Sequence, residues 1–311
     1  MKIGIFSKYK ESADRFNYYH GSPCKIMKII DELNKLFDFE YYINDYSKKY
    51  DAAIVDRINP QKKILSNNIL GIFETKIKKS FATKFCSISP SIPVGKDTFT
   101  LLNYCHGVKI NPIDLSKNRS NGVFLGRLDS MSEYKINFLN KNKFNLDIYP
   151  IKYWTKSGIL RFTGNTPESI KNLKFLQSKF SRSIVRPPVN HKYLYKKLNS
   201  QGYKYGFVPS IYHFNKNKIQ IESSSKFFEY IGSGIPVLIE SRVPEAKIVR
   251  NNPFLGEVFD SKAALISAAN KLEKNNYNYK KILDFAHKNH YPKSRAIKIY
   301  KNFIKDIIND K

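Results

Sequence analysis

Short apolar runs that alternate with helical patterns are the feature of this chain that most restricts its fold. Apolar, β-rich runs occur at residues 2–6 (KIGIF), 39–43 (FEYYI), 52–56 (AAIVD) and 69–74 (ILGIFE). Between the first two runs, apolar residues recur at the spacing of one helix face at Ile26, Ile29, Ile30, Leu33 and Phe37. Short buried strands that alternate with helices are typical of a parallel sheet with crossover helices. The sequence therefore predicts an α/β fold.

The same pattern starts again in the middle of the chain. Residues 122–128 (GVFLGRL) form an apolar run with a Gly-Arg turn, and an amphipathic helix is expected around residues 134–140. A length of 311 residues suits two domains. We predict an N-terminal Rossmann-like domain at 1–119, a C-terminal one at 120–293, and a helix over 294–311 that crosses back to the first domain. Open parallel sheets bind ligands at the carboxyl ends of their strands, so we expect the site in the cleft between the domains.

The chain carries a large positive charge. It has 54 Lys and Arg residues against 26 Asp and Glu residues, which gives a formal net charge of +28. Abundant Lys, Asn, Ile, Tyr and Phe indicate a compositional bias of the genome, but such a bias does not account for the shortage of carboxylates. We therefore expect a polyanionic partner: a nucleic acid, an anionic membrane or glycan surface, or the phosphates of a substrate.

Several classes of protein are disfavoured by what the sequence lacks. Cys24, Cys86 and Cys105 form no CxxC pair, and with the histidines they show no metal-ligand spacing. No run approaches the roughly 20 apolar residues of a bilayer-spanning helix, and the N-terminal MKIGIFSKYKES does not resemble a signal peptide. Neither a P-loop nor a GxGxxG motif occurs. We expect a cytoplasmic protein without a structural metal, either free or peripheral at the inner membrane face.

The most informative segment is SSSKFFEYIGSGIPVLI, at residues 223–239. Small residues such as Ser224 and Ser225 before a helix let backbone N–H groups meet a diphosphate, whose charge the helix N-terminus favours. Lys226 adds a positive charge there. Glu229 lies one turn later on the same helix face, where its carboxylate can accept both hydroxyls of a ribose. Each residue alone also suits an ordinary helix before a strand, but their order and spacing favour a nucleotide site.

This segment resembles the donor domain of nucleotide-sugar glycosyltransferases of the type B fold (GT-B), with its pattern Ser/Pro-x-Lys-x-x-Glu-Tyr-hydrophobic-x-x-Gly-x-Pro-Val. The resemblance extends from about residue 122 to the end of the chain and is only architectural before that. It implies two facing Rossmann-like domains with a cleft between them. It also implies a hexosyltransferase whose substrate is a nucleotide sugar, a UDP- or GDP-sugar, and which needs no cofactor or metal. Gly126 and Arg127 would then face the donor phosphates, although an exposed loop arginine has the same sequence signature.

The segment departs from the commonest bacterial GT-B family at one point. Retaining members of that family carry two glutamates separated by seven residues near the donor sugar. In this chain Glu222 and Glu229 are separated by six, and no Gly-Phe-Gly segment precedes them. The sequence therefore leaves open whether the reaction retains or inverts the configuration of the sugar.

The catalytic group of this fold usually comes from the first domain. It has to reach the acceptor hydroxyl or to stabilise the leaving diphosphate. Our candidates are His20, in the loop after the first strand, and Glu74, which follows the strand ILGIF. Asp56 and Asp97 are further candidates. A polar loop histidine and an exposed strand end account for His20 and Glu74 equally well.

The acceptor has two competing interpretations. GT-B enzymes commonly extend a surface glycan or glycolipid at the inner membrane face, and we rank this acceptor first. The second acceptor is DNA with hydroxymethylated bases, because the chain resembles phage DNA β-glucosyltransferases in its MKI-x-I start, in Glu74, in the turn at Gly126 and Arg127, and in Lys226 three residues before Glu229. The high positive charge favours DNA. A third alternative is a basic nucleic-acid-binding protein without enzymatic activity, in which a ribose-binding Glu229 would have no purpose.

Overall fold

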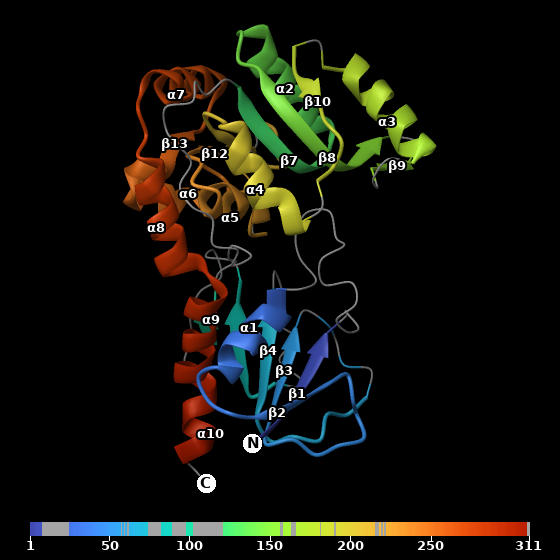
Figure 1. Ribbon diagram of the computed structural model, residues 1–311, viewed down its shortest axis with the longest axis vertical. Coiled ribbons are helices and arrows are strands. Elements are labelled where there is room, and N and C mark those ends of the chain that lie inside the picture. Colours follow the sequence, from blue (N-terminus) through green and yellow to red (C-terminus); the bar gives the residue numbers. More distant parts are fainter. Residues whose placement is uncertain are drawn as a thin grey trace.

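Two parallel β-sheets form the framework of the protein (Figure 1). The structure, a computed structural model, describes residues 1–7, 25–56, 58, 60, 62–73, 82–88, 98–101, 121–155, 158–162, 166–180, 182–189, 191–214, 218, 220 and 222–309. Both chain ends lie in the domain of the first sheet, at the bottom of Figure 1. The expected domain boundary at residues 119 and 120 falls outside the described residues.

All strands of the first sheet are parallel, in the order β2-β1-β3-β4-β5-β6. Their bounds are β1 (Lys2–Ser7), β2 (Glu40–Ile43), β3 (Ala52–Asp56), β4 (Ile69–Phe73), β5 (Lys84–Ser87) and β6 (Thr98–Thr100). The four strands predicted from the apolar runs are confirmed. Strands β5 and β6 were not predicted, because KFCS and TFT are too short and too polar to indicate a buried strand.

The two faces of the first sheet are covered differently. Successive side chains of a strand point to opposite faces, so Ile5 packs with α1 (Lys25–Asn34) while Phe6 packs with Tyr50 on the other face. The face of Ile5 also receives the end of the chain, which forms α9 (Pro292–Ile299), a π-helical turn (Tyr300–Ile304, η3) and α10 (Lys305–Asn309). The last helices therefore complete the core of the first domain (Figure 1).

The second sheet has the order β10-β8-β7-β11-β12-β13, with β9 antiparallel to the end of β8. Its strands are β7 (Gly122–Leu128), β8 (Leu146–Thr155), β9 (Gly158–Arg161), β10 (Ile184–Val185), β11 (Gly206–Val208), β12 (Val237–Glu240) and β13 (Gly256–Phe259). Counted along the chain without β9, the six parallel strands have the order 3-2-1-4-5-6. This is the Rossmann order, in which β7 and β11 flank the switch point that binds ligands.

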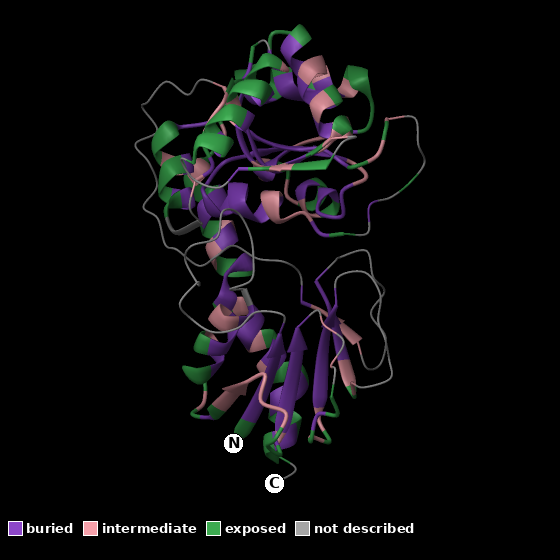
Figure 2. Cartoon of the chain, turned by 90° about the vertical axis from the view of Figure 1, so that its right-hand side faces the viewer, coloured by how far each residue is buried: buried purple, intermediate pink, exposed green. Residues whose placement is uncertain are grey.

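Helices cover both faces of the second sheet. One face packs against α4 (His191–Gln201), α5 (Ser225–Gly232), α6 (Ala246–Asn251) and α8 (Tyr279–His290). The other packs against α2 (Ser130–Lys141), α3 (Pro167–Ser178) and α7 (Lys262–Lys274). The central strands are accordingly buried in Figure 2, whereas the edge strands β9 and β10 are exposed or half-buried. In the described part of the chain, no helix is both long and apolar enough to cross a membrane.

Candidate functional site

The switch point of the second sheet is bridged by a tyrosine side chain. β7 and β11 pair at Val123 and Gly206, and beyond this pair the Tyr230 hydroxyl joins the strands. The backbone N–H of Leu125 donates to the hydroxyl at 2.9 Å, and the hydroxyl lies 3.2 Å from the carbonyl oxygen of Val123. A Cβ atom at position 206 would lie 2.2 Å from the Tyr230 ring, so this position needs glycine. Helix α5, which carries Tyr230, is thereby fixed beneath the switch point.

The segment before α5 is held by a buried carboxylate. Glu245, which is fully buried, accepts a hydrogen bond from the Ser223 hydroxyl at 2.5 Å and one from the backbone N–H of Ser224 at 3.1 Å. Ser224 is the N-cap residue of α5, and its side chain makes no capping hydrogen bond to this helix. The first turn of α5, which starts at Ser225, lies at the carboxyl edge of the sheet, and the side chain of its N-cap residue does not cap its backbone N–H groups.

Lys226 lies against the end of β7. Gly126 has a φ of +94°, and a Cβ atom on it would come within 3.7 Å of Lys226 Cε. The ammonium group lies 5.2 Å from the centroid of the Phe124 ring. The pKa of Lys226 is lowered to about 8, chiefly because burial disfavours the charged ammonium; Asp129 partly opposes this shift, and Arg127 adds to it. The structure thus brings together Gly126 and Lys226, which are 100 positions apart in the sequence.

Glu229 follows Lys226 by three positions on α5, and its side chain is 3% exposed. Residues three apart on a helix lie on the same face. A carboxylate is rarely buried to this extent, because desolvation disfavours its charged form. The burial agrees with a special role for Glu229, while its contact with a ribose stays a prediction.

Arg127 extends from the same edge of the sheet toward α2. A bulge at Gly126 and Arg127 shifts the register with β8 and redirects the arginine side chain. The guanidinium lies 3.9 Å from the Asp129 carboxylate and over the Trp154 ring, 4.9 Å from its centroid. Because its side chain is 52% exposed, Arg127 has access to solvent, and its contact with a donor phosphate stays a prediction.

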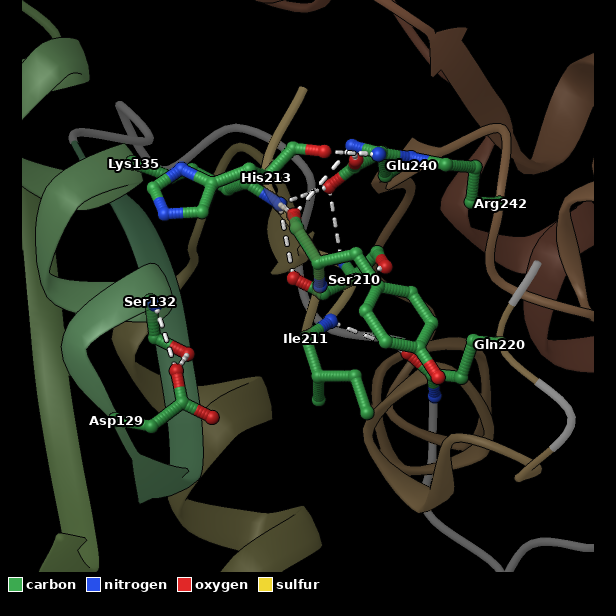
Figure 3. A network of polar contacts seen from close by, with 10 residues as sticks. Asp129, Ser132, Lys135, Ser210, Ile211, His213, Gln220, Glu240 and Arg242 are labelled. Atoms are coloured by element: carbon green, nitrogen blue, oxygen red, sulfur yellow. Dashed lines mark hydrogen bonds and ion pairs between the residues drawn. The ribbon is translucent and has the colours of Figure 1, made fainter. Parts of the chain in front are cut away.

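A buried ion network lies at the ends of β11 and β12, and it was not predicted from the sequence (Figure 3). The fully buried ammonium of Lys135 donates to Glu240 Oε2 at 2.6 Å and to the carbonyl oxygens of Ser210 and Tyr212 at 2.8 and 2.7 Å. Arg242 donates to the second Glu240 oxygen. Burial lowers the pKa of Lys135, although its pairing with Glu240 raises it. The network fixes the loop after β11, which borders the switch point.

Comparison with known proteins supports the same architecture. No family model matches the chain, and no curated protein matches its sequence. Among solved structures, AviGT4, a glycosyltransferase involved in avilamycin A biosynthesis, superposes with a TM-score of 0.61 at 12% identity over 99% of this chain and 98% of that chain. The lipopolysaccharide outer core galactosyltransferase WaaB gives 0.59 at 11% identity over 100% and 99%. Sucrose-phosphate synthase from Thermosynechococcus elongatus gives 0.63 at 10% identity over all of both chains.

The chain has the GT-B fold. The predicted α/β architecture with two Rossmann-like domains is confirmed. At 10 to 12% identity, the similarity establishes the fold and leaves the reaction to be argued from the residues of the site.

The catalytic candidates belong to the first GT-B domain. His20, Glu74 and Asp97 lie outside the described residues. Asp56 ends β3 at the carboxyl edge of the first sheet and is 4% exposed. Together with burial, its charge raises the pKa of the neighbouring Cys86 thiol. Within the described residues, no group of three or more His, Cys, Asp or Glu side chains could hold a metal ion.

Proposed function

We propose that this protein is a glycosyltransferase that transfers a hexose from a nucleotide sugar to a hydroxyl group of a surface glycan or glycolipid. One observation carries the proposal: Lys226, the N-terminus of α5 and the buried Glu229 lie together beside Gly126 at the switch point of the second sheet. The solved transferases with the same fold support the reaction class.

The site suits a nucleoside diphosphate in its chemistry. The first turn of α5 offers backbone N–H groups and the positive end of a helix dipole to the diphosphate. Lys226 adds a cation whose low pKa a bound anion would raise. Glu229 supplies a carboxylate for the two ribose hydroxyls, and hydrogen bonds to a charged group contribute about 1.5–3 kcal/mol. These interactions also stabilise the diphosphate as it leaves, so they can contribute to the transfer step itself.

A thermal-shift screen of UDP, GDP, ADP and CMP tests the donor site, because a ligand of the folded state raises the melting temperature by mass action. We expect one nucleotide to stabilise the protein, and Lys226→Ala and Glu229→Ala to lose this stabilisation. Lys262→Ala and Glu273→Ala on α7 are matched controls, since both residues are exposed, and they should keep it. A nucleotide shift that survives in both site variants would contradict the assignment of the donor site.

The acceptor is proposed on two grounds. WaaB, which has the same fold, is a lipopolysaccharide outer core galactosyltransferase, and a net charge of +28 suits a polyanionic acceptor or surface. Incubation with the radiolabelled donor identified above, and with either membrane glycolipids or hydroxymethylated DNA, tests the acceptor. Label in the glycolipid fraction supports the proposal, and label in DNA assigns the acceptor to DNA instead.

His20 and Glu74 are proposed as the catalytic residues. A base within reach of the acceptor hydroxyl typically contributes about 10²–10⁴-fold to the rate. We therefore expect His20→Ala or Glu74→Ala to reduce turnover by such a factor, while the nucleotide-induced thermal shift stays at the wild-type value. Wild-type turnover in both variants would remove the pair from the mechanism and direct attention to Asp56 and Asp97.

A further inference from the structure

We propose that the exposed face of the β8–β9 hairpin binds the acceptor through a sugar ring that carries a phosphate or a carboxylate. This face, called here the hairpin platform, is made of side chains from the end of β7 and from both strands of the hairpin: Arg127, Lys152, Trp154, Ile159 and Arg161. The inference rests on the proposed function and specifies its acceptor as an anionic glycan that the second domain helps to hold.

The residues of the hairpin platform share one face of three adjacent strands. Lys152 on β8 is opposite Arg161 on β9, and Trp154 is opposite Ile159. On the other side of β8, Arg127 of β7 is in register with Lys152. Residues in register point to the same side of a sheet, as do alternate residues of one strand, which lie about 7 Å apart. The platform therefore consists of a row of three cations and, next to it, a row of two apolar side chains.

The opposite face of the hairpin packs onto the second domain. Tyr153 and Phe162 belong to the same apolar cluster as Leu176 of α3, and Leu160 packs against this cluster. The hairpin platform is therefore on the side away from α3. In Figure 1, α3 lies above β9 and the first domain lies below it, so the platform is turned toward the first domain. An acceptor bound to the platform would lie between the two domains.

Trp154 gives the platform a flat apolar surface. Trp154 is 44% exposed, and Ile159 beside it is 39% exposed. The Arg127 guanidinium lies 4.9 Å from the centroid of the Trp154 ring. The face of an aromatic ring carries partial negative charge, which attracts the partly positive hydrogen atoms of C–H groups. Because one side of a sugar ring presents such C–H groups, Trp154 suits a sugar ring better than a small ion.

The row of cations next to Trp154 suits an anionic group. Neighbouring strands are about 4.8 Å apart, so Arg127, Lys152 and Arg161 can contact the same ligand. Arg127 lies 3.9 Å from the Asp129 carboxylate, with its own side chain 52% exposed, and such exposed pairs are weak. Among the residues that the structure describes, no ion pair involves Lys152 or Arg161. Like charges in register repel each other, and a bound phosphate or carboxylate would offset this repulsion through charge-assisted hydrogen bonds.

The hairpin platform begins next to the proposed donor site. Gly126 precedes Arg127 on β7, and a Cβ atom on Gly126 would come within 3.7 Å of Lys226 Cε. The charge of Arg127 adds to burial in lowering the pKa of Lys226, so the two cations are close enough to interact. A sugar on the platform would therefore lie beside a donor whose phosphates are bound at Lys226. Transfer requires this proximity, because the reacting atoms must approach to about 3–3.5 Å.

A sugar with one anionic group fits the platform better than a nucleic acid does. Proteins that hold single strands stack successive bases on several aromatic side chains. On the hairpin platform, the residue in register with Trp154 is the aliphatic Ile159. One ring on the apolar row and one anionic substituent on the row of cations account for the whole platform.

Trp154 provides a direct test, since it is the only tryptophan of the chain. The wild type and Lys226→Ala, which impairs the donor site, are titrated with glucose 6-phosphate, glucose and inorganic phosphate while the indole fluorescence is recorded. We expect glucose 6-phosphate to change the emission of both proteins at concentrations at which glucose and phosphate do not. No change, or an equal change with phosphate alone, would overturn the proposal. A response that Lys226→Ala abolishes would place the ligand in the donor site and overturn it as well.

Alanine variants separate the platform from the overall charge. Lys152→Ala with Arg161→Ala should weaken the binding of radiolabelled glucose 6-phosphate, measured by equilibrium dialysis, at least about tenfold, because two hydrogen-bonding cations are lost. Lys274→Ala with Lys280→Ala, on exposed positions of α7 and α8 at the other edge of the second sheet, changes the net charge equally and should keep the wild-type affinity. Equal losses in both double variants, or wild-type affinity in Trp154→Ala, would contradict a defined sugar site.

The nucleotide-induced thermal shift distinguishes this inference from the proposed function. If the shift is present and glucose 6-phosphate does not bind, the platform proposal fails and the transferase proposal stands. If no nucleotide shifts the melting temperature, the transferase proposal fails, and the acceptor role of the platform fails with it. An oligothymidylate that quenches Trp154 in the wild type but not in Lys152→Ala with Arg161→Ala, where glucose 6-phosphate has no effect, would assign the platform to nucleic acid instead.

Discussion

The two sheets of this protein share a parallel architecture but differ in what they bury. In the described residues of the first sheet and its connections, the ionisable side chains under 9% exposed are Asp56, Cys86 and Tyr50. Helix α9, which packs on this sheet, adds the buried Arg295. The second domain buries Lys135, Asp147, Glu229, Glu240 and Glu245. Buried charges are costly unless partners are supplied by the fold. The second domain therefore holds a fixed constellation of polar groups around its switch point, as expected for a site that binds a constant part of the substrate.

Among the variants considered, breaking the buried ion network should cause the largest loss of stability. Glu240→Ala leaves the ammonium of Lys135 and the guanidinium of Arg242 without their shared carboxylate. Removal of one partner of a buried ion pair costs about 3–5 kcal/mol. We expect this loss of stability in the second domain, measured by denaturant unfolding.

The matched control for this variant lies in the first domain. Glu32→Ala breaks the ion pair between Glu32 of α1 and Lys35, which follows the helix; the two side chains are 23% and 69% exposed. Exposed pairs contribute little because water and salt screen them, so we expect a near-wild-type midpoint. If the two variants were equally stable, the contrast between a buried and an exposed charge network would be wrong.

The second-largest loss of stability is expected for Tyr230, whose hydroxyl bridges the switch point. Tyr230→Phe removes the acceptor of the Leu125 N–H at a buried position. An unsatisfied buried donor costs about 1–3 kcal/mol. Tyr42→Phe in the first domain removes an exposed hydrogen bond to Glu40 and should cost much less. Equal unfolding midpoints of the two variants would show that the hydroxyl bridge between β7 and β11 contributes nothing.

The fold was predictable from the sequence where the local pattern and the tertiary structure agree. Apart from Asp56 and Arg127, the runs AAIVD and GVFLGRL are apolar, and both form strands with predominantly buried residues. Helices α3 and α8 were not predicted, because charged and aromatic residues obscure their apolar faces. Thr166 and Pro167 do form a typical helix start, and Thr166 caps α3 by accepting a hydrogen bond from the Ser169 N–H, so this signal was present.

Part of the candidate site was predictable for the same reason. Lys226 and Glu229 belong to one local motif, which needs no knowledge of distant contacts. Lys135 and Glu240 are 105 positions apart, and a lysine on an amphipathic helix is ordinarily an exposed residue. Their pairing depends on the approach of α2 to the end of β12, which no local pattern specifies. The glutamate that ends the apolar run VLIE is the one signal that could have indicated a buried carboxylate.

The third effect is a pH dependence of nucleotide binding to the second domain. The pKa of Lys226 is lowered to about 8, mainly by burial. A bound diphosphate favours the charged lysine, so the affinity for nucleotide should be constant well below this pKa and fall as the pH rises through it. The limit is about tenfold per pH unit, or about 1.4 kcal/mol. In Lys226→Arg the side chain stays charged, so the nucleotide affinity measured by calorimetric titration should stay constant between about pH 7 and 9.5. If the affinity of the wild type and of this variant fell equally, the pH dependence would belong to another group.

The smallest effect is expected where the end of the chain meets the first sheet. Lys84 on β5 donates to the carbonyl oxygen of Asn302 at 2.7 Å and to the Asp306 carboxylate at 3.1 Å. The Lys84 and Asp306 side chains are 33% and 62% exposed, so Lys84→Met should cost only about 0.2–1 kcal/mol. The apolar contacts of Ile299, Phe303 and Ile304 hold the terminal helices in place without this pair. The loss of stability in Lys84→Met should be smaller still in high salt, which screens exposed charges. A large loss that salt does not reduce would mean that polar contacts stabilise the first domain as they do the second.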